Sequence, residues 1–131
     1  MALIKQILET ALYVNNLDEA ERFYKTVFGL TTYSRGGNRH IFFRVGDSML
    51  LLFNPQETRQ PGSTAPTHGA VGEGHTAFAI SHDELDFWRK RLADLNVAIE
   101  KEHEWPEGGK SIYFRDPSGN SLELATPDTW P

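Results

Sequence analysis

Hydrophobic and polar positions follow the same order twice along this chain. The alternating stretch 9–14 (ETALYV) is matched by 75–80 (HTAFAI), and each has the pattern of a short strand. A helix is expected after each stretch, because Asn16 and Ser81 each stand three residues before a glutamate, the spacing of a capping box. The first of these helices is predicted to stop at Gly29.

After each predicted helix the hydrophobic period changes to two, which indicates strands. The stretch 39–44 (RHIFFR) resembles 110–115 (KSIYFR), and 49–55 (MLLLFNP) resembles 121–127 (SLELATP). The order strand, helix, three strands therefore occurs twice, which predicts an α+β fold of two tandem βαβββ modules. The single domain of residues 1–131 then divides into a first module, a joining loop rich in Gly, Pro, Thr and Ser, and a second module, at 5–55, 56–73 and 74–127.

Alternation within the strands assigns their side chains to two faces. The face under the helices is predicted to be apolar and to carry Thr10, Leu12, Val14, Ile41, Phe43, Val45, Leu50 and Leu52. The opposite face is more polar and is predicted to carry Glu9, His40, Phe42, Arg44, Leu51, His75, Ser111, Tyr113, Arg115 and Glu123. Such a set is typical of a binding surface, although water can also satisfy polar groups on an open sheet face.

Composition and charge narrow the possible partners. The net charge of −5 argues against a nucleic-acid partner, which requires a basic face, and is compatible with a cationic small molecule. The chain has no cysteine, so disulfides, thiolate nucleophiles and cysteine-based zinc sites are excluded. Lys5 and Glu9 interrupt the apolar start, which is typical of a strand rather than a signal peptide, and no apolar run would span a membrane. We expect a soluble cytoplasmic protein.

Three segments carry a family resemblance: 12–30 (LYVNNLDEAERFYKTVFGL), 74–81 (GHTAFAIS) and 111–127 (SIYFRDPSGNSLELATP). They resemble the vicinal oxygen chelate superfamily, also called the glyoxalase, bleomycin-resistance and dioxygenase superfamily. The resemblance implies a glyoxalase-like fold, in which two βαβββ modules form a U-shaped mixed sheet around a concave pocket that holds a divalent metal ion. By position, the resemblance places the four metal ligands of the family at Glu9, Leu51, His75 and Glu123.

The leucine changes what the resemblance implies for the metal site. Leu51 cannot bind a metal ion, so the expected ligands are Glu9, His75 and Glu123, and three ligands with open positions describe a catalytic site. A four-ligand glyoxalase I site is therefore disfavoured. The family more often has His or Gln in place of Glu9, which disfavours the dioxygenases. One imidazole and two carboxylates suit Zn²⁺, Ni²⁺, Mn²⁺ or Fe²⁺.

The remaining site residues follow from their strand face and from the family. Tyr113 is expected to donate a hydrogen bond or shuttle a proton, and Arg115 to clamp a substrate anion. The alternatives are that Tyr113 only packs and that Arg115 pairs with Asp116 or a glutamate. Ser111, Phe42 and Trp105 are the expected substrate-binding residues.

The spacing of Ser111, Tyr113 and Glu123 is that of the family's fosfomycin-modifying transferases. The basic residues of the potassium-binding loop of those enzymes are not evident in 103–109 (HEWPEGG), which argues against fosfomycin itself.

Two classes of function remain open at this point. One is a metal-dependent enzyme acting on a small oxygen-bearing substrate by lyase, isomerase or thiol-transferase-like chemistry. The other is a metal-free, bleomycin-resistance-like protein that sequesters a small molecule in an aromatic groove. With either function we expect a homodimer, because Trp130 near the end of the chain suits an interface. The alternative is that Trp130 folds back onto its own helix.

Overall fold

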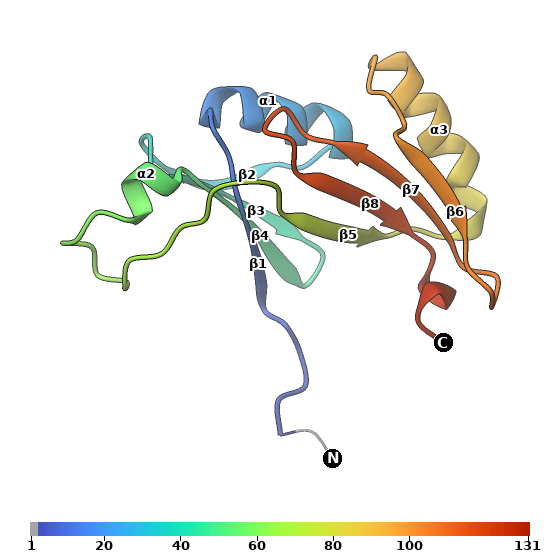
Figure 1. The fold of residues 1–131 in the computed structure, drawn as a ribbon, viewed down its shortest axis with the longest axis horizontal. Helices are drawn as coiled ribbons and strands as arrows, with labels where there is room; N and C mark the ends of the chain where they lie inside the picture. The colour runs from blue at the N-terminus through green and yellow to red at the C-terminus, as the bar shows by residue number, and fades with distance from the viewer. Residues whose placement is uncertain (1–2) are drawn as a thin grey trace. The chain divides into compact units, whose positions relative to one another are not determined.

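A computed structural model describes residues 3–131, which form two compact units (Figure 1). The first unit ends at Val71 and the second begins at Gly72, near the end of the predicted joining loop. Each unit contains a strand, a helix and three further strands, in the order that the hydrophobic pattern predicts. The α+β prediction of two βαβββ modules is therefore confirmed.

The first unit is a four-stranded mixed sheet with one long helix. Its elements are β1 (Glu9–Tyr13), α1 (Leu17–Phe28), β2 (Thr32–Gly36), β3 (His40–Val45), β4 (Ser48–Phe53) and α2 (Pro55–Thr58). The strand order is β1-β4-β3-β2, in which β1 and β4 run parallel and the other pairs are antiparallel. Helix α1 contacts β3 and β4.

The second unit repeats this topology with the order β5-β8-β7-β6 and the same single parallel pair, β5 with β8. Its elements are β5 (His75–Ala79), η1 (His82–Glu84), α3 (Leu85–Asp94), β6 (Lys101–Glu104), β7 (Lys110–Arg115), β8 (Ser121–Ala125) and η2 (Pro127–Thr129). Across residues 3–131, no helix is both long and apolar enough to cross a membrane.

The strand register shows that the internal repeat holds residue by residue. Leu51 pairs with the β1 residue two positions after Glu9. Glu123 pairs with the β5 residue two positions after His75. Glu9 and Leu51 therefore occupy the places in the first sheet that His75 and Glu123 occupy in the second, as the sequence alignment predicts.

Both helices begin where their capping residues predict. The Asn16 side chain accepts a 2.9 Å hydrogen bond from the Glu19 backbone N–H, and α1 ends at Gly29, whose φ of 68° suits a residue without a Cβ. Ser81 and Glu84 form a capping box, with the Ser81 N–H donating to the Glu84 carboxylate at 2.8 Å. The second helix differs in that its first turn is the tighter 3₁₀ form, η1.

The core of the first unit lies between α1 and the sheet, where alternation placed it. Leu12, Val14, Ile41, Phe43, Leu50 and Leu52 are all buried, and the Tyr24 ring of α1 stacks on Phe43 at 6.1 Å. Thr10 and Val45 were expected on this face but are exposed and half-buried, because they lie near strand ends. At the end of the predicted first module, the Asn54 side chain and Pro55 start the short helix α2, which continues into the predicted loop.

The C-terminal segment is tied to the second unit through Asp128. Its carboxylate accepts hydrogen bonds from the Thr126 hydroxyl at 2.6 Å and from His82 Nε2 at 2.8 Å. The Thr126 hydroxyl oxygen in turn accepts a 2.9 Å bond from the backbone N–H of Lys110, at the start of β7. The bonds from Thr126 and His82 hold the pKa of the Asp128 carboxyl below its ordinary value.

We predict that Asp128→Asn lowers the thermal unfolding midpoint at pH 7. A carboxyl with a lowered folded-state pKa stabilises the fold above the ordinary aspartate pKa of about 4, and this contribution is lost as the pH falls through the folded-state pKa. The two proteins should therefore converge in acid. Asp83→Asn, an exposed aspartate of η1, is the matched control. Equal midpoints of wild type and Asp128→Asn at every pH would contradict the role of this contact.

Candidate functional site

His75 and Glu123 meet on the free face of the second sheet. His75 begins β5 and Glu123 lies in the middle of the neighbouring β8, so the parallel register brings their side chains together. The distance from His75 Nε2 to Glu123 Oε1 is 3.2 Å. Glu123 is only 7 % exposed, whereas about half of the His75 side chain reaches solvent. A carboxylate buried to this degree needs partners for its charge.

The histidine ring is oriented by a backbone carbonyl. His75 Nδ1 lies 3.0 Å from the carbonyl oxygen of Ser121, which can only accept a hydrogen bond, so Nδ1 carries the proton. In the neutral ring Nε2 then presents a lone pair to Glu123 Oε1. Two acceptors this close require a proton or a cation between them. A histidine that donates its other N–H to a carbonyl is the usual arrangement of a metal ligand.

The second carboxylate oxygen of Glu123 is occupied by a chain of hydrogen bonds. The Ser111 hydroxyl donates to Glu123 Oε2 at 2.5 Å, and the Trp105 indole N–H donates to the Ser111 oxygen at 2.8 Å. Ser111 is only 1 % exposed. Glu123 Oε1 is therefore the carboxylate oxygen that faces His75.

Tyr113 lies directly across the strand pair from Glu123, on the same face. Its ring stacks on that of His75, with centroids 6.4 Å apart and planes inclined by 26°. Burial raises the pKa of the Tyr113 hydroxyl, and the negative charge of Glu123 raises it further. The hydroxyl therefore stays protonated at neutral pH and can donate a hydrogen bond.

A pocket of about 340 Å³ opens beside this group, along β6, β7 and the turn that joins them. It is lined by Glu100, Lys101, His103, Trp105 and Tyr113. Lys101 pairs across the strands with Tyr113 and His103 with Ser111, so both belong to the face that carries Glu123. A cavity of this volume accommodates part of a small molecule.

Arg115 lies on the predicted face but is engaged by other residues. Its guanidinium contacts Glu73 at 2.9 Å, Glu100 at 3.1 Å and the Gly119 carbonyl at 2.9 Å. The structure shows the pairing with glutamates that was the expected alternative. A role for Arg115 in clamping a substrate anion remains a prediction. Lys101, which the sequence reasoning missed, forms no ion pair within the described residues. The feature that could have identified Lys101 is its position directly across the strand pair from Tyr113.

Glu9 and Phe42 belong to the first unit. Glu9 is exposed at the start of β1. Phe42 stacks on His40 at 4.2 Å and meets Phe53 at 5.7 Å, in an aromatic cluster that His68 joins through a 2.7 Å hydrogen bond to the Tyr13 hydroxyl. Within neither unit do the described residues gather three His, Asp or Glu side chains that could hold a metal ion. His75 and Glu123 are thus a partial donor set.

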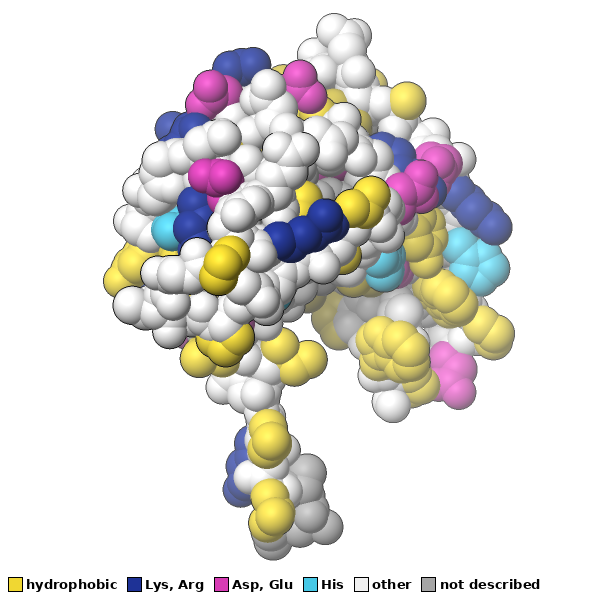
Figure 2. Space-filling model, turned by 60° about the vertical axis from the view of Figure 1, so that its left-hand side comes forward, with side chains coloured by type: hydrophobic (Ala, Val, Ile, Leu, Met, Phe, Trp, Pro, Cys, Tyr) yellow, Lys and Arg dark blue, Asp and Glu magenta, His cyan; other side chains and the backbone are white. Residues whose placement is uncertain are grey.

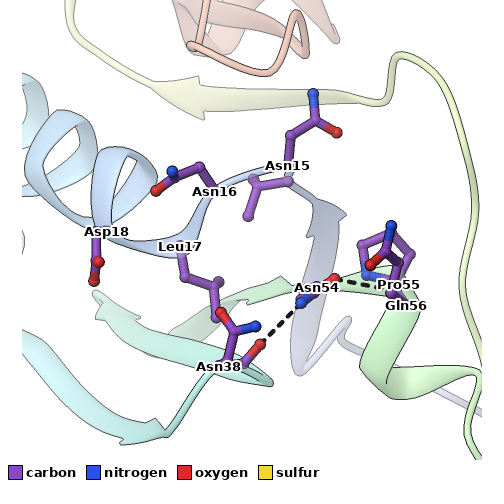
Figure 3. Close-up of a pocket in the computed structure, with 9 residues that line it drawn as sticks. Asn15, Asn16, Leu17, Asp18, Asn38, Asn54, Pro55 and Gln56 are labelled. Atoms are coloured by element: carbon purple, nitrogen blue, oxygen red, sulfur yellow. Dashed lines mark hydrogen bonds between the residues drawn. The ribbon is translucent and has the colours of Figure 1, made fainter.

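A second pocket, of about 320 Å³, lies in the first unit at the starts of α1 and α2 (Figure 3). It is lined by Val14, Asn15, Asn16, Leu17, Asp18, Asn38, Asn54, Pro55 and Gln56. The Asn54 side chain is engaged at both ends, by the Asn38 carbonyl and the Gln56 N–H. None of the residues predicted for the site lines this pocket.

The chain belongs to the Glyoxalase/Bleomycin resistance protein/Dioxygenase superfamily, whose family model matches residues 6–124. A solved structure, the lactoylglutathione lyase from Agrobacterium tumefaciens, is similar with a TM-score of 0.94 and 42 % identity over 98 % of each chain. The metallothiol transferase FosB of Shouchella clausii (strain KSM-K16) is 32 % identical over 127 residues, 95 % of this chain and 82 % of its own. The glutathione transferase FosA of Serratia marcescens is 28 % identical over 125 residues, 93 % and 82 % of the two chains.

These comparisons confirm the family and the glyoxalase-like fold. They also agree with the prediction of an enzyme of lyase or thiol-transferase character, since the three similar proteins are named as enzymes of these kinds. The roles assigned to individual site residues remain predictions.

Proposed function

We propose that this protein is a metal-dependent enzyme that adds a thiol to a small electrophilic substrate. The observation that carries the proposal is the 3.2 Å contact between His75 Nε2 and Glu123 Oε1, which requires a proton or a cation between the two atoms. Each of the two side chains is also fixed by a further hydrogen bond, as the ligands of a metal site usually are. The names of FosB and FosA, a metallothiol transferase and a glutathione transferase, support the reaction class.

His75 and Glu123 would hold the ion together with Glu9, the third ligand that the family resemblance implies. Imidazole nitrogen and carboxylate oxygen suit Zn²⁺, Ni²⁺, Mn²⁺ or Fe²⁺. The bound ion supplies Lewis acidity, which stabilises negative charge on a substrate oxygen. Because the chain contains no cysteine, the attacking sulfur has to come from a second small molecule.

The surrounding side chains bind and orient the substrate. The protonated Tyr113 hydroxyl can donate to a substrate oxygen, and Lys101 offers a positive charge to an acidic group of the substrate. Trp105 and His103 form the wall of the pocket, with their rings edge-on at 4.4 Å. Ser111, expected to bind substrate, is instead buried against Glu123 and acts on the carboxylate.

A second candidate is a metal-free protein that sequesters a small molecule, as expected of the bleomycin-resistance members. The aromatic cluster of the first unit favours it, because the half-buried rings of Tyr13 and Phe42 pack around the buried Phe53. With either function we expect a cytoplasmic protein. We expect its partner to be a small molecule, because the net charge of −5 suits no nucleic acid.

Metal content separates the two functions. We predict that the wild-type protein, stripped with a chelator and dialysed, takes up about one divalent ion per chain from Mn²⁺, Ni²⁺ or Zn²⁺. Glu123→Gln should weaken the affinity by more than about 100-fold, beyond the effect typical of a residue that only supports a ligand. Glu107→Gln, in the exposed β6–β7 turn, is the control. Elemental analysis showing no metal in the wild type with any of the three ions would leave the sequestering function.

We predict that Lys101 rather than Arg115 selects for an anionic substrate. Lys101→Gln should weaken the binding of methylphosphonate by about 10-fold, the equivalent of one charge-assisted hydrogen bond. Arg115→Gln should change it by less than about threefold, because Glu73 and Glu100 already neutralise this charge. Titration followed by tryptophan fluorescence reports binding, since Trp105 lines the pocket. A larger effect of Arg115→Gln would reverse the assignment.

We further propose that the working unit is a homodimer. Leu3, Ile4, Ile7 and Leu8 precede β1 and are 66–94 % exposed, and Figure 2 shows hydrophobic side chains along this segment. Trp130 is 87 % exposed, so the alternative in which it folds back onto its own helix does not apply. Exposed apolar side chains in such numbers are typical of interaction surfaces.

Sedimentation equilibrium is expected to give about twice the chain mass of 14.8 kDa. Ile4→Ser combined with Ile7→Ser should weaken the association, because these side chains lose the apolar area that a partner chain would cover. Val71→Ser, at another exposed apolar position, should leave it unchanged. A monomeric wild type at micromolar concentration would contradict the dimer.

A further inference from the structure

We infer that Trp105 is a positioning residue for the Glu123 carboxylate and acts through the hydroxyl of Ser111. The inference rests on the proposed function in one respect, because it treats Glu123 as a metal ligand. Its geometric part concerns only hydrogen bonds inside the second unit. Those bonds run from the indole N–H to the serine oxygen and from the serine hydroxyl to the carboxylate.

The indole holds the serine hydroxyl in its bond to the carboxylate. An indole N–H can only donate, so at 2.8 Å it occupies a lone pair of the Ser111 oxygen. The serine proton is then directed to the other neighbour at hydrogen-bonding distance, Glu123 Oε2 at 2.5 Å. The carboxylate can only accept, so Ser111 is the donor in this bond. The indole holds the serine oxygen in place and polarises the hydroxyl, which strengthens the bond that Ser111 donates to Glu123.

The consequence for Glu123 is a fixed carboxylate. One oxygen is held by Ser111, and the other faces His75 Nε2 at 3.2 Å. Ser111 and Glu123 are 1 % and 7 % exposed, so little water competes for these bonds, and each bond polarises the next. The carboxylate is therefore oriented for metal binding before the ion arrives.

The backbone of Trp105 is held by the turn between β6 and β7. The Trp105 backbone N–H donates to the Gly109 carbonyl at 2.7 Å, and the Gly108 backbone N–H donates to the Trp105 carbonyl at 2.9 Å. Gly108 has a φ of 97°, which L side chains rarely adopt. A Cβ on Gly109 would lie 2.5 Å from the backbone nitrogen of Thr129. The turn thus requires both glycines.

A wall role for Trp105, in which only the ring contacts substrate, makes a different prediction from a positioning role. Trp105→Phe keeps an aromatic ring at the pocket wall and removes the N–H donor. If Trp105 acts through Ser111, loss of the indole N–H has no further effect on metal affinity in a protein that already lacks the serine hydroxyl. A double-mutant cycle measures this dependence.

The first experiment measures Mn²⁺ and Zn²⁺ affinity by competition with a chelator. Trp105→Phe and Ser111→Ala should each weaken binding by about 10-fold or more, the range for residues that support a metal ligand. The double variant should bind the metal ion no more weakly than the single variant with the lower affinity. Trp88→Phe, the same change in α3, should have no effect. Unchanged affinity of Trp105→Phe, or additive losses in the double variant, would overturn the inference.

The second experiment uses NMR on the metal-free protein, so that its outcome does not depend on the proposed function. The Trp105 indole proton should exchange with solvent more slowly in the wild type than in Ser111→Ala. Trp105→Phe should also shift the carboxyl ¹³C resonance of Glu123, whereas Trp88→Phe in α3 should not. Fast exchange at Trp105 or an unmoved Glu123 resonance would refute the positioning role. If both signals are as expected but the wild type binds no metal, the proposed function fails and Trp105 still positions Glu123.

Discussion

The site of the second unit depends on a nearly buried carboxylate. Glu123 lies on the free face of a sheet but is only 7 % exposed, and an ionised group in that position is stable only with partners. Ser111 satisfies one oxygen, and the other is left opposite a histidine nitrogen that is itself an acceptor. A proton or a metal ion has to complete that contact. The proposed metal-dependent activity rests on this pair.

The fold supplies the rigidity that this carboxylate needs. Strand β8 lies between β5 and β7, so it is paired on both sides. Leu122 and Leu124, which flank Glu123, are fully buried on the opposite face. Because side chains alternate along a strand, anchoring these two leucines aims the glutamate at the free face. A substitution that loosened either leucine would disturb the site through the backbone.

Two basic residues near the site differ in their contacts: Arg115 binds groups of the protein, and Lys101 lines the pocket. Arg115 binds Glu73, Glu100 and the Gly119 carbonyl, and so joins the start of β5, the approach to β6 and the β7–β8 turn. Its charge is used within the protein. Lys101 lines the pocket and lies next in the chain to Glu100. The proposed anionic substrate would therefore meet the lysine rather than the arginine.

The sequence alone determined the order of elements, the two helix starts and the sheet face that carries His75 and Glu123. These features follow from local signals: capping residues, periods of two and 3.6, and an internal repeat that fixes the register. Only the tertiary structure decided what Trp105, Ser111 and Arg115 do. All three lie on or beside the predicted face, but their roles depend on which group stands 2.5–3.1 Å away. Hydrogen-bond partners such as Glu100 and Glu73 come from distant positions in the chain, and no local pattern specifies them.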